Sequence, residues 1–153
     1  MKLSKKSEYA LRALIQIALH DSEEVVRLQA LAKEENIPFK FLEGILRDLK
    51  NVGILRSKRG VGGGYALNKS PQQITLGQVI RLMDGPLAPI RCVSKTAYAP
   101  CSCPDEAACG LRSVMYEVRN AITGILDQTT LADVCRRTKH LMVYSSDKPV
   151  YAI

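Results

Sequence analysis

The sequence predicts a mainly α-helical fold with a small β wing, in which a winged helix-turn-helix precedes a long helix suited to dimerisation. Three observations predict it. Residues 38–51 combine an apolar stripe with a basic face at helical spacing. Residues 58–64 are basic and rich in glycine, and they lie between two short apolar segments, as in a hairpin. Residues 111–125 carry an apolar heptad pattern.

The helix expected at residues 38–51 has two distinct faces. Apolar residues recur at positions i, i+3, i+4 and i+7, namely Leu42, Ile45, Leu46 and Leu49. The opposite face carries Lys40, Glu43, Arg47 and Lys50. Pro38 suits the start of the helix, and Asn51 with Gly53 suits its end. A helix with such a polar face can enter the major groove, so these four polar residues are predicted to contact DNA.

The basic hairpin that follows is predicted to form the wing, with apolar strand segments at 54–55 and 65–67. It contributes the remaining predicted DNA contacts, which are Lys58, Arg59, Gly62 and Gly63. A phosphate-cradling loop of a nucleotide enzyme is the rival interpretation. However, Tyr65 breaks the pattern G-x-G-x-x-G, and the sequence contains no G-x-x-x-x-G-K-[ST] motif.

Two further helical patterns precede this unit, at residues 4–19 and 27–35. Ser4 or Ser7 can cap the first helix, and Asn36 ends the second. Only a few residues separate the second helix from the third, as a helix-turn-helix requires. The third helix is therefore predicted to be the recognition helix.

The charge distribution favours a polyanionic partner. The net charge is +7, and residues 1–70 hold 13 basic against 8 acidic residues. This excess, on the half that carries the helix and the hairpin, predicts double-stranded DNA as the partner. No apolar run approaches the length of a membrane span, and the N-terminus lacks a signal-peptide pattern. The sequence therefore predicts a cytoplasmic protein without a membrane partner.

The second half contains a long irregular segment and then a long helix. Thr75 and Gln78 form a capping box that starts a helix ending near Gly85. Residues 86–110 lose all periodicity, and a loop of this length usually has a function. The seam of the helix beyond it consists of Leu111, Met115, Val118, Ile122 and Ile125. This seam predicts packing against a second copy of the chain, as a homodimer.

The C-terminal part is expected to be short and partly irregular. Thr130 and Asp133 form a second capping box, which starts a helix expected to end near Thr138, with Cys135 buried on it. The tail is predicted to be coil or a short edge strand. The predicted division is a DNA-binding domain at 1–85, a cysteine-rich sensor loop at 86–110, a dimerisation unit at 111–138 and a tail at 139–153.

Four of the five cysteines crowd into the irregular loop, with the spacing C-x8-C-x-C-x5-C, and they are Cys92, Cys101, Cys103 and Cys109. Clustered thiolates suit soft metals and iron–sulfur clusters, whereas zinc favours paired knuckles that this spacing lacks. A metal-free thiol–disulfide switch stays open. A small cysteine-dependent oxidoreductase is the alternative from another class, although the sequence has no C-x-x-C motif.

Several segments together resemble the IscR/NsrR-type (Rrf2) family of winged-helix regulators. They are residues 1–4, 9–14, 41–43, 59–65 and 128–133. The resemblance covers the chain to about residue 138. It implies a homodimeric transcription regulator, not an enzyme, with an N-terminal winged helix and a long dimerisation helix. It also implies an iron–sulfur cluster on the loop between them, [2Fe–2S] in preference to [4Fe–4S], whose state sets the affinity for the operator.

The resemblance also implies roles for individual residues. The family's three cysteine ligands fall on Cys92, on Cys101 or Cys103, and on Cys109. Arg112 occupies the position at which IscR carries a fourth, histidine ligand, so that scheme fails here. NsrR-like members use an acidic residue from the first helix of the partner subunit, and Glu8 matches that position. For DNA, the resemblance supports Glu43 in the recognition helix and Arg59 in the minor groove.

Overall fold

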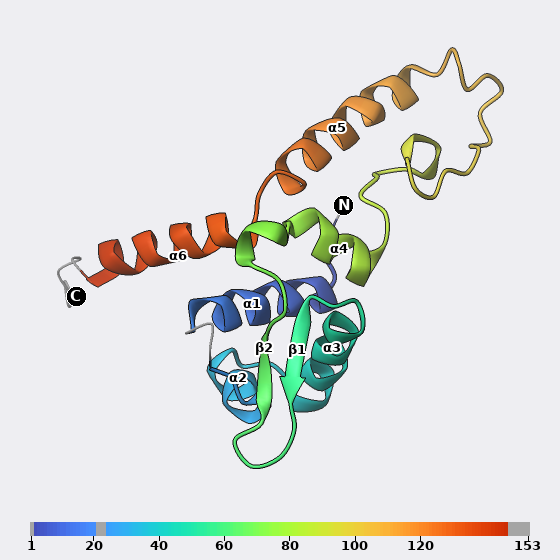
Figure 1. Cartoon of the computed structure of the whole chain (residues 1–153). Coiled ribbons are helices and arrows are strands. Elements are labelled where there is room, and N and C mark those ends of the chain that lie inside the picture. The colour runs from blue at the N-terminus through green and yellow to red at the C-terminus, as the bar shows by residue number, and fades with distance from the viewer. Residues whose placement is uncertain (1, 21–23, 147–153) are drawn as a thin grey trace, which may run out of the picture.

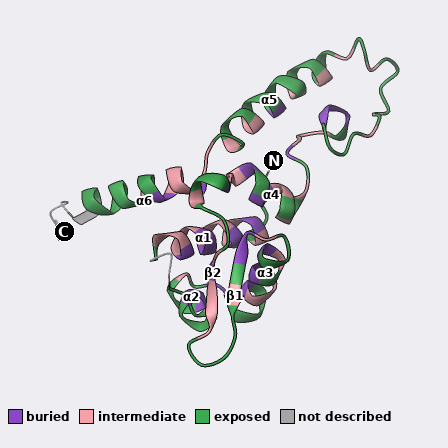
Figure 2. Cartoon of the chain, viewed as in Figure 1, coloured by how far each residue is buried: buried purple, intermediate pink, exposed green. Residues whose placement is uncertain are grey.

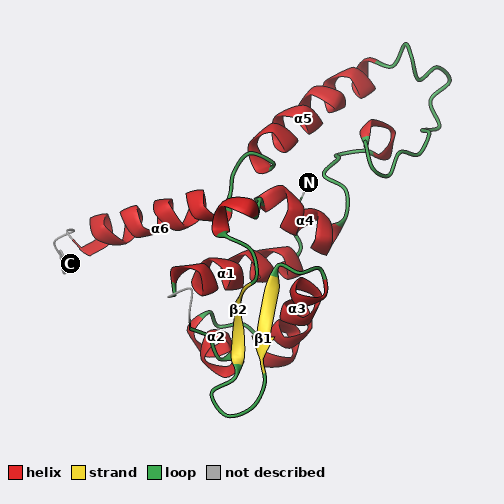
Figure 3. Ribbon diagram, viewed as in Figure 1, coloured by secondary structure: helices red, strands yellow, loops and turns green. Residues whose placement is uncertain are grey.

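The computed structural model describes residues 2–20 and 24–146 (Figure 1). Its helices are α1 (Lys5–Leu19), α2 (Leu28–Glu34), α3 (Phe39–Asn51), α4 (Leu76–Asp84), α5 (Gly110–Leu126) and α6 (Leu131–Ser146). Strand β1 (Leu55–Lys58) pairs antiparallel with β2 (Gly64–Leu67), and Leu55 lies opposite Leu67. Figure 3 shows this small sheet beside a mainly helical chain. The predicted fold class, a mainly α winged helix, is confirmed.

Helices α1, α2 and α3 enclose one apolar core beside the wing. Ser4 caps α1, because its side chain accepts a hydrogen bond from the Ser7 backbone N–H at 3.1 Å. Asn36 adopts a φ of 50° in the turn between α2 and α3, as its residue type allows. The leucines expected on the inner face of α3, Leu42, Leu46 and Leu49, are fully buried. The predicted helix-turn-helix geometry follows from this packing.

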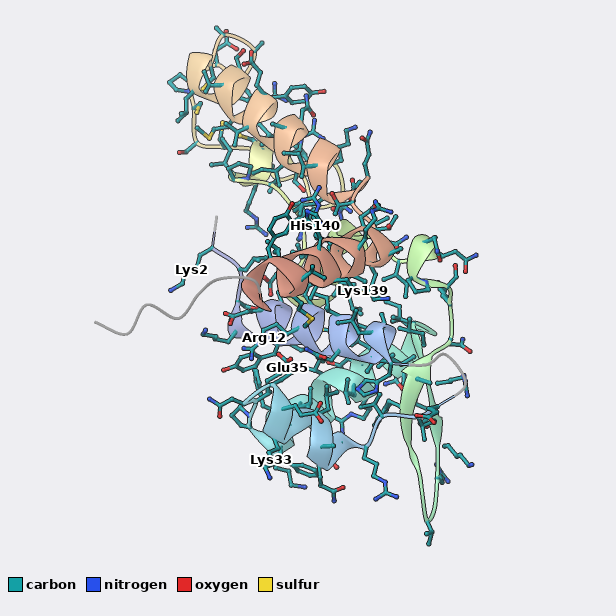
Figure 4. All side chains as sticks on the ribbon, turned by 90° about the vertical axis from the view of Figure 1, so that its left-hand side faces the viewer. Lys2, Arg12, Lys33, Glu35, Lys139 and His140 are labelled. Atoms are coloured by element: carbon teal, nitrogen blue, oxygen red, sulfur yellow. The ribbon has the colours of Figure 1, made fainter. Side chains whose placement is uncertain are left out.

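Two ion pairs connect these helices at their edges. Arg12 of α1 donates from Nε to Glu35 Oε2 at 2.9 Å, and Glu35 lies just past the end of α2. Both side chains are labelled in Figure 4. Lys6 Nζ lies 2.8 Å from Asp48 Oδ2, which joins α1 to α3. All four side chains remain partly accessible to water, so the pairs orient the helices more than they stabilise them.

Backbone hydrogen bonds anchor the wing, which is β1, β2 and their connecting turn, to the helical body formed by α1, α2 and α3. Val26 N donates to Tyr65 O at 2.8 Å, and Tyr65 N donates back to Val26 O at 2.9 Å. Gly64 permits this approach, because a Cβ there would lie 2.4 Å from the Val26 carbonyl oxygen. The segment before α2 thus holds the hairpin against the helices, which fixes the direction of the wing.

Helix α5 projects away from this body and carries the cysteine loop at its outer end (Figure 1). The chain then returns to the body. Leu76 N donates to Thr129 O at 3.0 Å, and Leu131 N donates to Ile74 O at 2.8 Å. Leu131 and Cys135, at the start of α6, are buried in the same apolar core as α1 and α3. The core of the DNA-binding body therefore includes residues far beyond the proposed boundary at 85.

The prediction for the C-terminal segment was wrong. The capping box at Thr130 and Asp133 is present, but α6 continues to Ser146 instead of ending near Thr138. No glycine or proline interrupts residues 131–146, so nothing stops the helix where the apolar pattern weakens. Residues 147–153 of the predicted tail lie outside the described part of the chain.

The projecting helices are exposed along most of their length (Figure 2). Several large apolar side chains on α5 and α6 lie in water in the single chain, including Ile125 at 66% exposure and Leu141 at 67%. None of the described helices is both long enough and apolar enough to cross a bilayer.

Candidate DNA interface and cysteine site

The polar face of α3 is exposed, as expected of a recognition helix. Lys40, Arg47 and Lys50 all lie in water, whereas the Glu43 side chain is about half exposed. Lys40 Nζ lies 3.2 Å from Glu43 Oε2, so the lysine holds this carboxylate on the helix surface. Gly44 leaves the surface beside Arg47 open, since a Cβ there would contact only the Arg47 guanidinium. The four predicted residues thus share one face that a DNA groove can reach.

The tip of the wing is a tight, exposed turn. Lys58 ends β1, and Arg59 follows it in the loop; both side chains are exposed. Gly60 and Gly62 have φ values of 90° and 76°, which residues with a side chain rarely adopt. Gly63 N donates to Gly60 O at 2.9 Å and closes the turn. The glycines therefore bring two cationic side chains to a narrow hairpin, which suits approach to a phosphate backbone or minor groove.

The four loop cysteines gather into one site at the N-terminal end of α5. The Sγ atoms of Cys92 and Cys101 and a carboxylate oxygen of Glu106 all lie within 4.8 Å of one another. Cys103 Sγ and Cys109 Sγ are 3.9 Å apart. Two thiolates on one tetrahedral metal lie about 3.8 Å apart if the metal–sulfur distance is about 2.3 Å. The thiols therefore fit a shared metal group, and they line a cavity of about 370 Å³.

Glu106 is a residue of this site that sequence reasoning missed. Its Oε2 accepts a hydrogen bond from the Tyr98 hydroxyl at 2.8 Å. Its Oε1 lies 3.2 Å from Arg112 Nε, but that N–H donates to the Cys92 carbonyl oxygen instead. Oε1 is buried and has no hydrogen-bond partner among the described residues. A buried carboxylate oxygen without a donor, next to two thiols, fits a metal ligand. In the sequence, Glu106 lies midway between Cys103 and Cys109, and this place between two candidate ligands is the signal that could have identified it.

The local contacts give the thiols different acidities. Burial raises the pKa of the Cys92 thiol, and the neighbouring Cys101 raises it further. A hydrogen bond from Cys103 lowers the pKa of Cys101. Hydrogen bonds with Cys101 and Cys109 raise the pKa of Cys103 to about 12. Cys101 is thus the more readily ionised member of the C-x-C pair, and Cys103 the less readily ionised one.

Cys109 also has a structural role. Its sulfur accepts a hydrogen bond from the Arg112 backbone N–H at 3.4 Å, so this cysteine is the N-cap of α5. The thiol site and the long helix therefore share a residue.

Glu8 and Cys135 lie outside the thiol site of their own chain. Glu8 belongs to α1 and pairs with Lys5 Nζ at 2.8 Å and with Arg12 at 3.6 Å. The hydrogen bond from Lys5 lowers the pKa of the Glu8 carboxyl. Cys135 is buried in the core, where burial raises the pKa of its thiol. The buried role predicted for Cys135 is confirmed.

Known proteins resemble this chain over nearly its whole length. A regulator of the helix-turn-helix type from Rhodobacter capsulatus, named rrf2-like, is 40% identical over 136 residues, covering 86% of this chain and 91% of that protein. The structure of CymR, the global cysteine regulator of Bacillus subtilis, has a TM-score of 0.76 at 31% identity and covers 90% of this chain and 98% of its own. IscR from T. potens has a TM-score of 0.71 at 28% identity, with 90% and 88% covered.

These relatives are transcription regulators, which decides against the cysteine-dependent oxidoreductase considered above. The Rrf2 family profile, described as an iron-dependent transcriptional regulator, matches residues 3–137. The chain therefore belongs to the Rrf2 family and is a DNA-binding transcription regulator.

Proposed function

We propose that this regulator binds DNA as a homodimer and that an iron–sulfur cluster on the cysteine loop sets its affinity for the operator. One observation carries the proposal: four thiols and a buried carboxylate oxygen, which accepts no hydrogen bond from the described residues, converge at the start of the long helix. Thiolate and carboxylate groups are ligands of iron, so their gathering in one loop favours iron binding over a purely structural role for these side chains.

The ligands come from the loop itself. Cys92 and Cys101 lie on one side, with Glu106 beside them, and Cys103 and Cys109 lie in contact with each other. Cys101 is the middle ligand in a three-cysteine set, because it lies near Cys92 and is the more acidic thiol of its pair. Glu106 supplies the carboxylate in cis, whereas Glu8 could reach a loop only from the partner subunit. A [2Fe–2S] cluster, when bound, supplies a redox-sensitive centre.

The coupling to DNA runs through α5. Cys109 caps this helix, and Arg112 in its first turn donates to the Cys92 carbonyl oxygen at 3.3 Å. Ordering of the loop around its ligands therefore fixes the start of α5. A homodimer seam on α5 would pass that change to the two recognition helices and alter their spacing. DNA contact itself rests on Lys40, Arg47 and Lys50 of α3 and on Arg59 of the wing.

The cluster is tested by anaerobic reconstitution with iron and sulfide, followed by visible absorption and circular dichroism. The wild-type protein should gain visible absorption, and Cys92→Ala or Cys109→Ala should abolish it. Cys135→Ala is the matched control, because this cysteine is buried in the core away from the loop. Wild-type protein that gains no visible absorption would refute the cluster.

The carboxylate ligand is tested with the same spectra. Glu106→Gln should still bind iron but should shift the absorption and dichroism bands, because one ligand changes. Glu8→Gln, a matched substitution on α1, should leave the bands unchanged. The opposite result would place the fourth ligand on the partner subunit instead.

The link to DNA is tested by binding assays with a duplex that the protein selects from a random-sequence pool. Holo and apo protein should differ in Kd at least fivefold. Affinity should also fall steeply with salt, because phosphate contacts release counterions. Equal affinity of both forms on every selected duplex would contradict the coupling.

A thiol switch without metal is the second candidate function. The observation that favours it is the 3.9 Å separation of the Cys103 and Cys109 sulfurs, since a disulfide between them needs only a small further approach. Mass spectrometry of oxidised, metal-free protein distinguishes this mechanism. Oxidised wild-type protein should be lighter by the mass of two hydrogen atoms, whereas oxidised Cys103→Ser should not. This mass difference, together with a changed DNA affinity, would support the switch.

A further inference from the structure

A buried arginine lies in the middle of α5, where the long helix meets the loop and α4. Arg119 is 2% exposed. Its Nε and Nη2 atoms are buried and have no hydrogen-bond partner among the described residues. The guanidinium carbon lies 4.4 Å from the centroid of the Tyr116 ring, but a ring face does not replace hydrogen-bond acceptors. A guanidinium stays charged, so burying it without acceptors is costly.

The side chain lines a cavity of about 80 Å³. The cavity walls come from the end of α4, the loop after η2 (Arg91–Val93) and the second half of α5. Their polar members are Arg81, Ser94, Lys95, Thr96, Arg119, Thr123 and Asp127. One water needs about 10–15 Å³ on this scale, so the space exceeds that of a single bridging water. It suits a group of four or five heavy atoms.

The charges around the cavity favour an anion. Asp127 is already engaged, because its two oxygens accept hydrogen bonds from Arg81 at 2.6 Å and 2.8 Å. The hydrogen bonds from Arg81 lower the pKa of the Asp127 carboxyl. Lys95 also interacts with the Asp127 carboxylate, so this one carboxylate shares the cavity wall with three cations, Arg81, Lys95 and Arg119. Ser94 Oγ accepts from Ala97 N at 3.0 Å, which leaves its hydroxyl hydrogen for a ligand.

We propose that this cavity binds a small oxyanion, held by the guanidinium of Arg119 and assisted by Lys95 and Ser94. A planar guanidinium fork matches two oxygens of a phosphate, sulfate or carboxylate group. Such an anion would place a counter-charge beside the buried guanidinium and would join α5 to the loop and to α4. Among the described residues, no cysteine lines the cavity, so anion binding and the visible absorption of a cluster are measured separately, and one can fail while the other is present.

Thermal unfolding of the full chain tests the site. Phosphate, sulfate and acetate are each titrated against chloride at equal ionic strength, which separates tetrahedral anions from carboxylates and removes general salt effects. At about a hundredfold excess over Kd, the preferred anion should raise the Tm by about 5–10 °C. Isothermal titration should give one anion per chain. No rise above the chloride reference with any of the three anions would overturn the proposal.

Variants tie the response to the arginine. Arg119→Met keeps the volume and removes the charge, so its Tm should not respond to the anion. Arg119→Lys keeps the charge without the fork and should bind at least tenfold more weakly; it also serves if the methionine variant fails to fold. Arg137→Met, an exposed arginine on α6, should respond as wild type does. An undiminished rise in Tm with the anion in both Arg119 variants would overturn the site. A Tm that changes with protein concentration but not with anion concentration would also overturn it.

Discussion

At the base of the wing turn, Gly63 occupies a position where no side chain fits. A Cβ there would lie 2.4 Å from the Lys58 carbonyl oxygen and 2.9 Å from that of Gly60. Both contacts are with backbone atoms, which cannot move aside without opening the turn. The residue therefore fixes the shape of the loop that carries Arg59.

Gly63→Ala should distort the wing and weaken DNA binding about tenfold or more, at a stability cost of about 1–3 kcal/mol. Fluorescence anisotropy with a selected duplex and urea unfolding measure the two effects. Val61→Ala is the control, because Val61 is fully exposed at the tip of the same turn. Equal affinities of the two variants would remove the wing from the interface.

Asp133 gives a prediction about pH. Hydrogen bonds from the Thr130 side chain and backbone, assisted by Arg136, hold the pKa of Asp133 at about 2, below its usual 3.8. A lowered folded-state pKa contributes stability above the unfolded value, and this stability is lost as pH falls through the folded value. Wild type should therefore be more stable than Asp133→Asn at pH 6, and the difference should disappear between pH 4 and 2. A difference that is constant in urea unfolding across this range would refute the cap's role.

At the scale of single residues, sequence reasoning succeeded where a local rule applies. Thr130 and Asp133 form a capping box because their spacing of three determines the contact. Glu106 and Arg119 were missed for the opposite reason. Nothing near Glu106 in the sequence shows that Arg112 would donate to a carbonyl group instead of to its carboxylate. Likewise, Arg119 looks like one more polar position on an amphipathic helix until α4 and the loop close over it.

At the scale of elements, α5 is a helix with little of its own chain to pack against. The predicted seam is present on it, and Leu111, Val118 and Ile125 are exposed in the single chain. A helix with such a face is stable when it packs on a second apolar surface. This exposure is the physical basis for the proposed homodimer.

Ile125→Glu should convert a dimer to a monomer, because a charge would be buried in the seam. Sedimentation equilibrium measures the mass, and operator affinity should fall at least tenfold as one half-site is lost. Asn120→Glu, an exposed change between seam positions, should leave both values near wild type. A dimer that persists in Ile125→Glu would place the interface elsewhere, for instance on the exposed apolar residues of α6.

The error in the length of α6 also belongs to this scale. The helix was predicted to end where its apolar periodicity ends. Helical backbone can continue beyond that point when no glycine or proline interrupts it. Residues 141–144 are apolar yet exposed, so they keep the helix without adding to the core. The sequence alone does not show whether such a segment continues a helix or leaves it.

At the scale of the whole molecule, the DNA-binding body is closed by residues that follow the cysteine loop. Leu131 is 1% exposed and packs in the same cluster as Leu14 of α1 and Leu42 of α3. The consecutive domains expected from the sequence did not include this packing of Leu131 against α1 and α3. Contacts between segments that are distant in the sequence leave no periodic signal in it.

Leu131→Ala should therefore destabilise the entire body by about 2–5 kcal/mol, as loss of a fully buried leucine does. Urea unfolding should remain a single transition, and DNA binding should disappear with it. Lys139→Ala, an exposed change on the same helix, should shift the stability by less than about 0.5 kcal/mol. A second transition for α6 in Leu131→Ala would show that the body folds without it.

This closure has a consequence during synthesis. Chains leave the ribosome from the N-terminus, and domains fold as their parts emerge. The body cannot finish its interior until Leu131 and Cys135 are outside the exit tunnel, and by then all four loop thiols have already emerged. Each nascent molecule thus offers its sulfurs to metallation or oxidation before it can hold a promoter.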